Sequence, residues 1–166
     1  MIKNIDKKIY FALYNFTVSH GLISKQVVFI TKFSSKVFSF IYFTVGAWLI
    51  YKNDPRLKNF ILIPAAVYLI VKIIPLIYNR SRPFAEYKLK SLVKQREDQS
   101  FPSTHSGSSM IIALTVLNIN LKLGVFMIFL SVLTSISRIT VGVHYPTDIL
   151  AAWIIAITLN FVGVKF

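Results

Sequence analysis

Long apolar stretches separated by short polar blocks make up most of this chain. The apolar stretches cover residues 26–51, 59–79, 104–118, 122–141 and 147–165. A helix needs about 20 mainly apolar residues to cross the hydrocarbon core of a bilayer, and most of these stretches are close to that length. The pattern therefore predicts an all-α, polytopic membrane helical bundle with about five spans, of which the third is short.

The first 20 residues have a different pattern and predict a different element. The segment is basic and aromatic, with Lys3, Lys7 and Lys8 followed by Tyr10, Phe11, Tyr14 and Phe16. A helix of this composition is too polar to span a bilayer and is typical of the membrane interface. Polar loops are expected at 52–58 and 80–101. The second loop has enough apolar residues for a short surface helix, namely Phe84, Tyr87, Leu92 and Val93.

Composition supports a membrane protein. The 166 residues are 55% hydrophobic and have a mean hydropathy of +0.62, which is unusual for a soluble domain of this size. No internal repeat or linker divides the chain, so we expect one integral-membrane domain over residues 1–166. A cleaved signal peptide is not expected, because the first apolar stretch lacks a small-residue cleavage site. The absence of cysteine excludes disulfides, thiol nucleophiles and thiolate metal sites.

The net charge of +13 indicates anionic partners. In a soluble protein such a charge would favour nucleic acid. In a hydrophobic chain it favours an anionic membrane surface and an anionic lipid substrate, with no nucleic acid as partner. The sequence gives no indication of an oligomeric state.

Three polar blocks lie at the ends of the apolar stretches: residues 80–83, 101–107 and 137–148. Because successive spans cross the membrane in alternating directions, all three blocks are expected at the same membrane face. Charged groups at such places are costly unless they have a function. The blocks are therefore predicted to form one polar site.

The first and third blocks each contain an arginine suited to phosphate. Arg82 and Arg138 are permanently protonated, and their planar forks of donors match phosphate oxygens. Either arginine alone is also consistent with a side chain that reaches from a helix end to the membrane surface. Both together, beside histidines, indicate a phosphate clamp.

The second block predicts the start of a helix. Ser103 or Thr104 can cap it, and the free N–H groups of a first turn form an anion site. An ordinary capped helix would have the same sequence signal. His105 in that first turn favours catalysis, because its imidazole can protonate a leaving oxygen.

The third block pairs His144 with Asp148. Pro146 and Thr147 indicate a helix start, so Asp148 in the first turn can contact one nitrogen of His144. That contact would leave the other nitrogen free to attack phosphorus. A purely structural His–Asp hydrogen bond is the alternative. A zinc site built from the histidines and Asp148 is disfavoured, because the arginines would repel a cation.

Together the blocks resemble the type 2 phosphatidic acid phosphatase family, whose members share a site with vanadium haloperoxidases. The family pattern is Lys-x6-Arg-Pro, then Pro-Ser-Gly-His, then Ser-Arg-x5-His-x3-Asp. The third motif is complete here, from Ser137 and Arg138 to His144 and Asp148. The resemblance covers roughly residues 60–160 and implies a phosphatidic acid phosphatase/haloperoxidase-like core.

Two positions depart from the family pattern. Thr104 stands where glycine is usual, which keeps the backbone N–H but adds a side chain. Pro75 stands where the family has its lysine, which removes a cation. Lys72 and Arg80 are the two nearby candidates to replace that cation.

The resemblance implies a role for each matched residue. His144 would be the nucleophile that forms a phosphohistidine, Asp148 would orient it, and His105 would protonate the leaving group. The phosphate would be bound by Arg82, Arg138, Ser103 and Thr104. Neither a metal nor another cofactor is implied.

The bacterial undecaprenyl-diphosphatase branch is the part of the family that the chain looks most like. This implies hydrolysis of undecaprenyl diphosphate to undecaprenyl phosphate. Phosphatidylglycerophosphate and phosphatidate are alternative substrates. Halide oxidation with vanadate and non-catalytic binding or transport of a lipid phosphate are remote alternatives, the last favoured by the missing lysine. We expect a bacterial cytoplasmic membrane and, from the resemblance, an extracytoplasmic active site, although basic residues lie at both ends of the spans.

Overall fold

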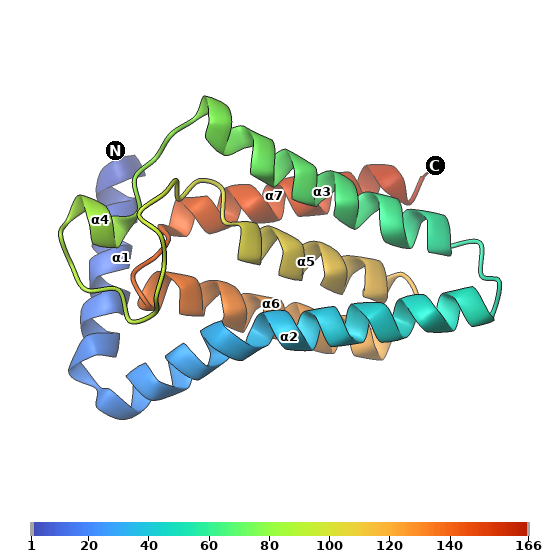
Figure 1. The fold of residues 1–166 in the computed structure, drawn as a ribbon, viewed down its shortest axis with the longest axis horizontal. Coiled ribbons are helices and arrows are strands. Elements are labelled where there is room, and N and C mark those ends of the chain that lie inside the picture. The colour runs from blue at the N-terminus through green and yellow to red at the C-terminus, as the bar shows by residue number, and fades with distance from the viewer. Residues whose placement is uncertain (1, 166) are drawn as a thin grey trace.

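A computed structural model describes residues 2–165 and confirms a helical membrane bundle. In chain order the helices are α1 (Ile2–Ser19), α2 (Gly21–Tyr51), α3 (Leu57–Ile77), α4 (Pro83–Glu86), α5 (Thr104–Leu117), α6 (Leu121–Thr140) and α7 (Pro146–Gly163). Figure 1 shows α2, α3, α5, α6 and α7 side by side along the long axis of the molecule. These five helices correspond to the five predicted apolar stretches.

Four of these helices, α2, α3, α6 and α7, are long and apolar enough to cross a membrane. The fifth, α5, has only 14 residues and lies at the centre, packed against all four. It needs no lipid-facing length, because its neighbours bury most of its side chains. Two apolar clusters hold it there, one around Ala113 and Val116 and the other around Met110 and Ile111.

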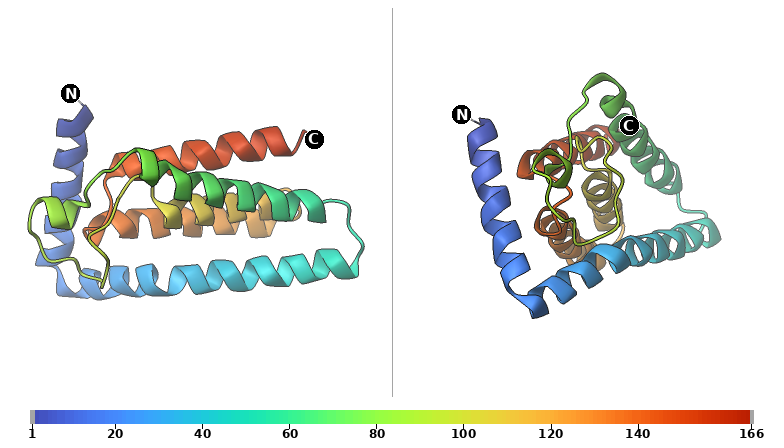
Figure 2. Two further views of the ribbon diagram at one scale, coloured as in Figure 1. Left: turned by 45° about the horizontal axis from the view of Figure 1, so that its top comes forward. Right: turned by 60° about the vertical axis from the view of Figure 1, so that its left-hand side comes forward.

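Helix α1 lies across one end of the bundle instead of along it, as both views in Figure 2 show. It does not meet the criteria for a span, as its polar composition predicts. Tyr10 and Tyr14 attach it to the bundle by packing against Ile139, Tyr145 and Ile149. The hydroxyl of Tyr14 also donates a hydrogen bond of 2.7 Å to the Lys90 carbonyl.

Two local expectations differ from the structure. Helix α2 begins at Gly21, before the apolar stretch, and its 31 residues give it a length of about 46 Å, more than a bilayer core requires. The short helix in the loop after α3 is α4, and it is not a surface helix. Phe84 of α4 is buried against Val141 and Val143, so the apolar residues of this loop pack inward.

The loops at the α1 end bring the three polar blocks together. The α3–α5 loop and the α6–α7 loop both lie at this end, opposite the α2–α3 and α5–α6 connections (Figure 1). Within the longer loop, Ser81 pairs with Gln99 in an antiparallel bridge, and the Ser100 N–H donates a hydrogen bond of 2.7 Å to the Arg80 carbonyl. This bridge holds residues 98–100 beside the first block.

Candidate active site

A pocket of about 220 Å³ opens among the three blocks. Its lining residues come from α3, α5, α6 and the two loops: Lys72, Pro75, Arg82, Gln95, Asp98, Gln99, Pro102, Thr104, His105, Arg138 and His144. Both predicted catalytic histidines and both predicted clamp arginines therefore line one cavity. Its side chains are rich in fixed cations, which suits an anion such as phosphate.

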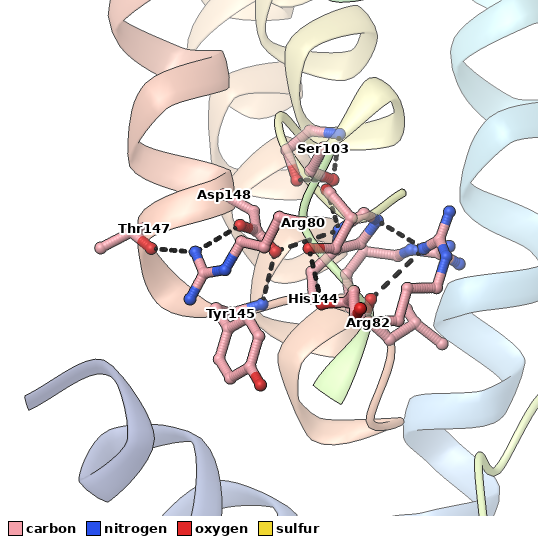
Figure 3. A network of polar contacts seen from close by, with 12 residues as sticks. Arg80, Arg82, Ser103, His144, Tyr145, Thr147 and Asp148 are labelled. Carbon is pink, nitrogen blue, oxygen red and sulfur yellow. Dashed lines mark hydrogen bonds and ion pairs between the residues drawn. The ribbon is translucent and has the colours of Figure 1, made fainter. Parts of the chain in front are cut away.

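His144 lies in the loop just before α7 and is buried. Its Nδ1 is 2.9 Å from the Ser100 carbonyl oxygen and 3.5 Å from Oδ2 of Asp148. Two oxygen acceptors on this side assign the ring proton to Nδ1. The Nε2 atom is then an unprotonated acceptor, and Nη1 of Arg82 lies 3.3 Å from it (Figure 3).

The electrostatic surroundings keep this imidazole neutral. Burial lowers the pKa of His144 to about 4, and the positive charges of Arg138 and Arg82 act in the same direction. The contact with Asp148 acts in the opposite direction and raises that pKa. The neutral ring is the form that can attack phosphorus.

Asp148 is fully buried at the third position of α7. Its Oδ2 accepts a hydrogen bond of 2.8 Å from the N–H of Tyr145, the capping residue of the helix. Its Oδ1 accepts one of 2.7 Å from Nη1 of Arg80. The predicted contact between Asp148 and His144 is present, but the Ser100 carbonyl is the nearer partner of Nδ1.

Both clamp arginines are buried and each contacts a side chain of the α3–α5 loop. Nε and Nη2 of Arg82 each lie 2.8 Å from Oδ1 of Asp98. Nη2 of Arg138 donates to Gln95 Oε1 at 3.1 Å. Nε of Arg138 is buried with no hydrogen-bond partner among residues 2–165, which leaves a donor without an acceptor in the wall of an anion pocket.

The start of α5 is arranged as its sequence predicts. Ser103 is the capping residue, and its Oγ accepts hydrogen bonds from the N–H and the hydroxyl of Ser106. Thr104 and His105 are the first two helical residues and line the pocket, and N–H groups at these positions have no acceptor within the helix. Ser103 itself is buried and does not line the pocket, and its Oγ supports the turn at which Thr104 and His105 begin the helix.

The two candidate replacements for the family lysine lie in different places. Lys72, one turn before Pro75 on α3, lines the pocket. Arg80 does not, because its guanidinium lies between Asp6 and Asp148 on the other side of the catalytic pair. Only Lys72 is placed where it can meet a phosphate.

Sequence reasoning missed four residues near the site. Gln95, Asp98 and Ser100 contact the clamp arginines and His144, and Asp6 contacts Arg80 from α1. The loop residues carry no motif, since their contacts depend on the path of the loop. A signal did exist for Asp6, which is the single acidic residue in a basic N-terminal helix.

Comparisons with known proteins give a family, sequence relatives and structures of the same fold. Residues 56–166 match the model of the PAP2 superfamily. Undecaprenyl-diphosphatase BcrC of Bacillus subtilis is 29% identical over 98% of this chain and 84% of its own length. The crystal structure of Aquifex aeolicus LpxE has a TM-score of 0.77 at 22% identity and covers 96% of this chain and 94% of its own. A transmembrane PAP2-type phosphatidylglycerolphosphate phosphatase from Bacillus subtilis also has a TM-score of 0.77, at 21% identity, over 99% of this chain and 85% of its own.

Proposed function

The chain belongs to the PAP2 superfamily and is an integral-membrane lipid phosphatase, and on this premise we propose that it hydrolyses undecaprenyl diphosphate to undecaprenyl phosphate through a phosphohistidine. The observation that carries the proposal is the single pocket lined by His105, His144, Arg82 and Arg138, with Asp148 directly behind His144. A long-chain lipid diphosphate fits the setting, because the pocket lies at one end of a bundle of membrane helices.

In the first step Nε2 of His144 attacks the terminal phosphorus. The bond from that phosphorus to the bridging oxygen breaks, and the oxygen leaves with undecaprenyl phosphate after taking a proton from His105, which is protonated in the complex because the negative charge of the bound diphosphate stabilises its cationic form. Arg82, Arg138 and the N–H of Thr104 bind the non-bridging oxygens, where negative charge is held in the transition state. Phosphorylation leaves the imidazole ring cationic, and Asp148 and the Ser100 carbonyl stabilise its Nδ1–H.

In the second step water attacks the phosphohistidine. His105, now deprotonated, takes a proton from that water, and the N–P bond breaks to release inorganic phosphate and neutral His144. Each residue returns to its starting protonation state. Besides one water molecule, the groups used are residues of the pocket lining together with Asp148 and the Ser100 carbonyl behind His144, and arginine side chains supply positive charge at the phosphate.

The choice of undecaprenyl diphosphate rests on the relative from Bacillus subtilis, which is named for that activity and whose sequence aligns with nearly the whole chain. Phosphatidylglycerophosphate is the second candidate, because a protein named for that activity shares the fold.

We place the protein in the bacterial cytoplasmic membrane with the pocket on the extracytoplasmic face. The domain extends over residues 1–166.

Phosphate release in detergent with EDTA tests the proposal. Undecaprenyl diphosphate, phosphatidylglycerophosphate and phosphatidate are compared as substrates, with His144→Ala as the inactive variant. The matched control is His20→Ala, because His20 is exposed at the α1–α2 junction, where its ring lies within hydrogen-bond distance of Ser19 and Phe16 and packs on the Phe16 ring. We expect release from undecaprenyl diphosphate by the wild type and by His20→Ala, and none by His144→Ala.

Acid-free trapping with phosphorus-labelled substrate then tests the intermediate. A label that is stable to alkali, labile to acid and absent in His144→Ala is the expected result. Faster phosphate release from either glycerolipid would show that this lipid, and not undecaprenyl diphosphate, is the preferred substrate. Phosphate release without labelling of the protein would rule out the phosphohistidine intermediate. No release from any of the three lipids would favour a binding protein.

A further inference from the structure

Helix α1 contributes a buried carboxylate to the region behind the catalytic pair. Asp6 is only 3% exposed although it lies on a helix at the end of the bundle. Its Oδ1 accepts a hydrogen bond of 3.0 Å from the Thr147 N–H, and its Oδ2 accepts one of 2.6 Å from the Thr147 hydroxyl. A residue near the N-terminus therefore binds the first turn of α7, one position before Asp148.

Arg80 joins this carboxylate to Asp148. Its Nη2 lies 2.6 Å from Oδ2 of Asp6, and its Nη1 lies 2.7 Å from Oδ1 of Asp148. The same Nη1 donates to the Thr147 hydroxyl at 2.7 Å, and the guanidinium stacks on the Tyr145 ring at 3.9 Å from its centre. Figure 3 shows Arg80 on the side of Asp148 that faces away from Arg82.

These contacts determine which oxygen of Asp148 faces the imidazole. Arg80 engages Oδ1, so Oδ2 is the oxygen left for the Tyr145 N–H and for Nδ1 of His144. Without Arg80 the carboxylate would lose the partner that fixes its rotation and compensates its charge in a fully buried place. The position of Asp148 thus depends on Arg80, and that of Arg80 depends on Asp6.

The three ionised side chains also have a net charge that matters for the reaction. Asp6, Arg80 and Asp148 together carry one negative charge. In the mechanism above the imidazole of His144 becomes cationic when it is phosphorylated. The net negative charge of the three side chains therefore stabilises the phosphorylated, cationic ring. If Asp6 were neutral, Arg80 would cancel the charge of Asp148, and the cationic ring would face a neutral pair.

We propose that Asp6 and Arg80 are positioning residues for the His144–Asp148 pair, and that the second carboxylate, Asp6, keeps the group behind His144 negatively charged. Neither residue touches the substrate, so both act through Asp148. The inference rests on the proposed phosphohistidine mechanism and extends it to α1, which lies outside the residues that the family model matches.

Other charged groups around His144 act on the same equilibrium. Those that line its pocket or contact it come from every neighbouring element: Lys72 on α3, Arg82 before α4, Asp98 in the following loop, His105 on α5, Arg138 on α6 and Asp148 on α7. None of them is changed in the test below. A change in the titration of His144 in Asp6 or Arg80 variants is therefore attributable to the group behind Asp148.

Three variants test the proposal by the sign of a pKa change. Asp6→Asn removes a negative charge, whereas Arg80→Gln removes a positive one. Asp54→Asn is the matched control, because Asp54 also forms an ion pair with an arginine, Arg56, but at the opposite end of the bundle. The His144 ring is titrated by NMR of the nitrogen-labelled protein in detergent, with His144→Gln to assign its signal, and kcat and KM are measured with undecaprenyl diphosphate.

We expect the pKa of His144 to fall in Asp6→Asn, to rise in Arg80→Gln and to be unchanged in Asp54→Asn. Both site variants should lower kcat about 10- to 100-fold, as removal of residues that orient metal-binding histidines does, with little change in KM. Asp6→Glu should restore the titration. A merely structural role would move both pKa values in the same direction, or neither, and would overturn the proposal.

Two further controls keep the test decisive. Where Asp6→Asn does not fold, Arg80→Lys keeps the charge but loses the fork, so kcat should fall while the pKa of His144 stays near the wild-type value. A changed pKa in Arg80→Lys would contradict the proposal. Where the wild type hydrolyses none of the lipids, the proposed function fails, but the NMR titration still decides whether Asp6 and Arg80 act on His144.

Discussion

His144 has opposite surroundings on its two ring nitrogens. Nδ1 faces the Ser100 carbonyl and Asp148, while Nε2 faces a pocket lined by arginines. The acceptors fix the tautomer, while burial, assisted by the positive charges of Arg138 and Arg82, lowers the pKa of His144 and keeps the ring unprotonated. A single residue thereby combines two conditions for a nucleophile, namely a free lone pair and a stabilised cationic product.

The pH dependence of activity follows from this environment. Because burial lowers the pKa of His144 to about 4, the acid limb of kcat/KM should lie well below the ordinary pKa of histidine, about 6.5. The free energy of unfolding should also decrease as the pH falls. The unfolded chain takes up the proton first, so the folded protein loses stability as the pH falls from about 6.5 towards 4. A pH profile with an acid limb at or above 6.5 would contradict this assignment.

Lys72 is predicted to supply the cation that the family motif loses at Pro75. Lys72→Ala should remove about 2.7 kcal/mol of transition-state stabilisation, by analogy with the loss of one oxyanion-hole donor, and lower kcat/KM by about 100-fold. Lys72→Arg should keep most of the activity. Lys58→Ala is the control on the same helix, because Lys58 is exposed near the opposite end of α3. Equal kcat/KM in Lys72→Ala and Lys58→Ala would show that Lys72 does not supply the missing cation.

For single residues, the sequence predicts the positions of motif residues in the site better than the positions of the residues that contact them. His105, Arg138 and His144 line one pocket because each stands at a fixed spacing next to a helix end. Asp98 escaped prediction because its contact with Arg82 depends on the fold of a loop without periodicity. Arg80 was one of two candidates, with Lys72, to replace the family lysine, but it faces the two buried carboxylates because the loop after α3 turns it away from the pocket.

Among the elements, the α5–α6 hairpin requires glycine at one position. A Cβ on Gly124 would lie 2.2 Å from Cα of Leu117, and backbone atoms there cannot move aside cheaply. Gly124→Ala should therefore destabilise the protein by about 1–3 kcal/mol, the usual cost of overpacking, and lower the Tm in detergent.

Gly21 provides the matched control for this substitution. It stands at the first residue of α2, and a Cβ there would meet nothing within 4 Å. Gly21→Ala should leave the Tm unchanged or raise it slightly, since alanine favours a helix. Similar losses of Tm in both variants would show that the close approach of α5 and α6 is not the cause.

Helices were predictable where hydrophobicity alone defines them. The apolar stretches locate α3, α5, α6 and α7 within about three residues, because lipid and neighbouring helices both select apolar side chains. The start of α2 was missed, since that helix continues beyond its apolar part to Gly21. Phe84 was misplaced on a surface helix because a sequence pattern does not show which loop side chains fold back onto the bundle.

The whole molecule has two chemically different ends, and its orientation is testable. The chain contains no cysteine, so single cysteines report without background. Lys94→Cys places a thiol on the exposed part of the α3–α5 loop, and Lys52→Cys places one at the α2–α3 connection. With the site on the extracytoplasmic face, a membrane-impermeant maleimide should label intact cells at position 94 and label position 52 only after permeabilisation. The reverse pattern would place the pocket in the cytoplasm.

The ion pair between Arg82 and Asp98 makes phosphate binding an exchange of anions. A phosphate that uses Nε and Nη2 of Arg82 must displace the carboxylate of Asp98, whose side chain is half exposed. The affinity for phosphate then depends on the difference in free energy between the Arg82–phosphate and Arg82–Asp98 ion pairs, and salt weakens both pairs. KM should consequently depend only weakly on ionic strength in the wild type. In Asp98→Asn the KM should be lower at low salt and rise more steeply as salt is added, so this loop would make substrate capture less sensitive to the salt concentration.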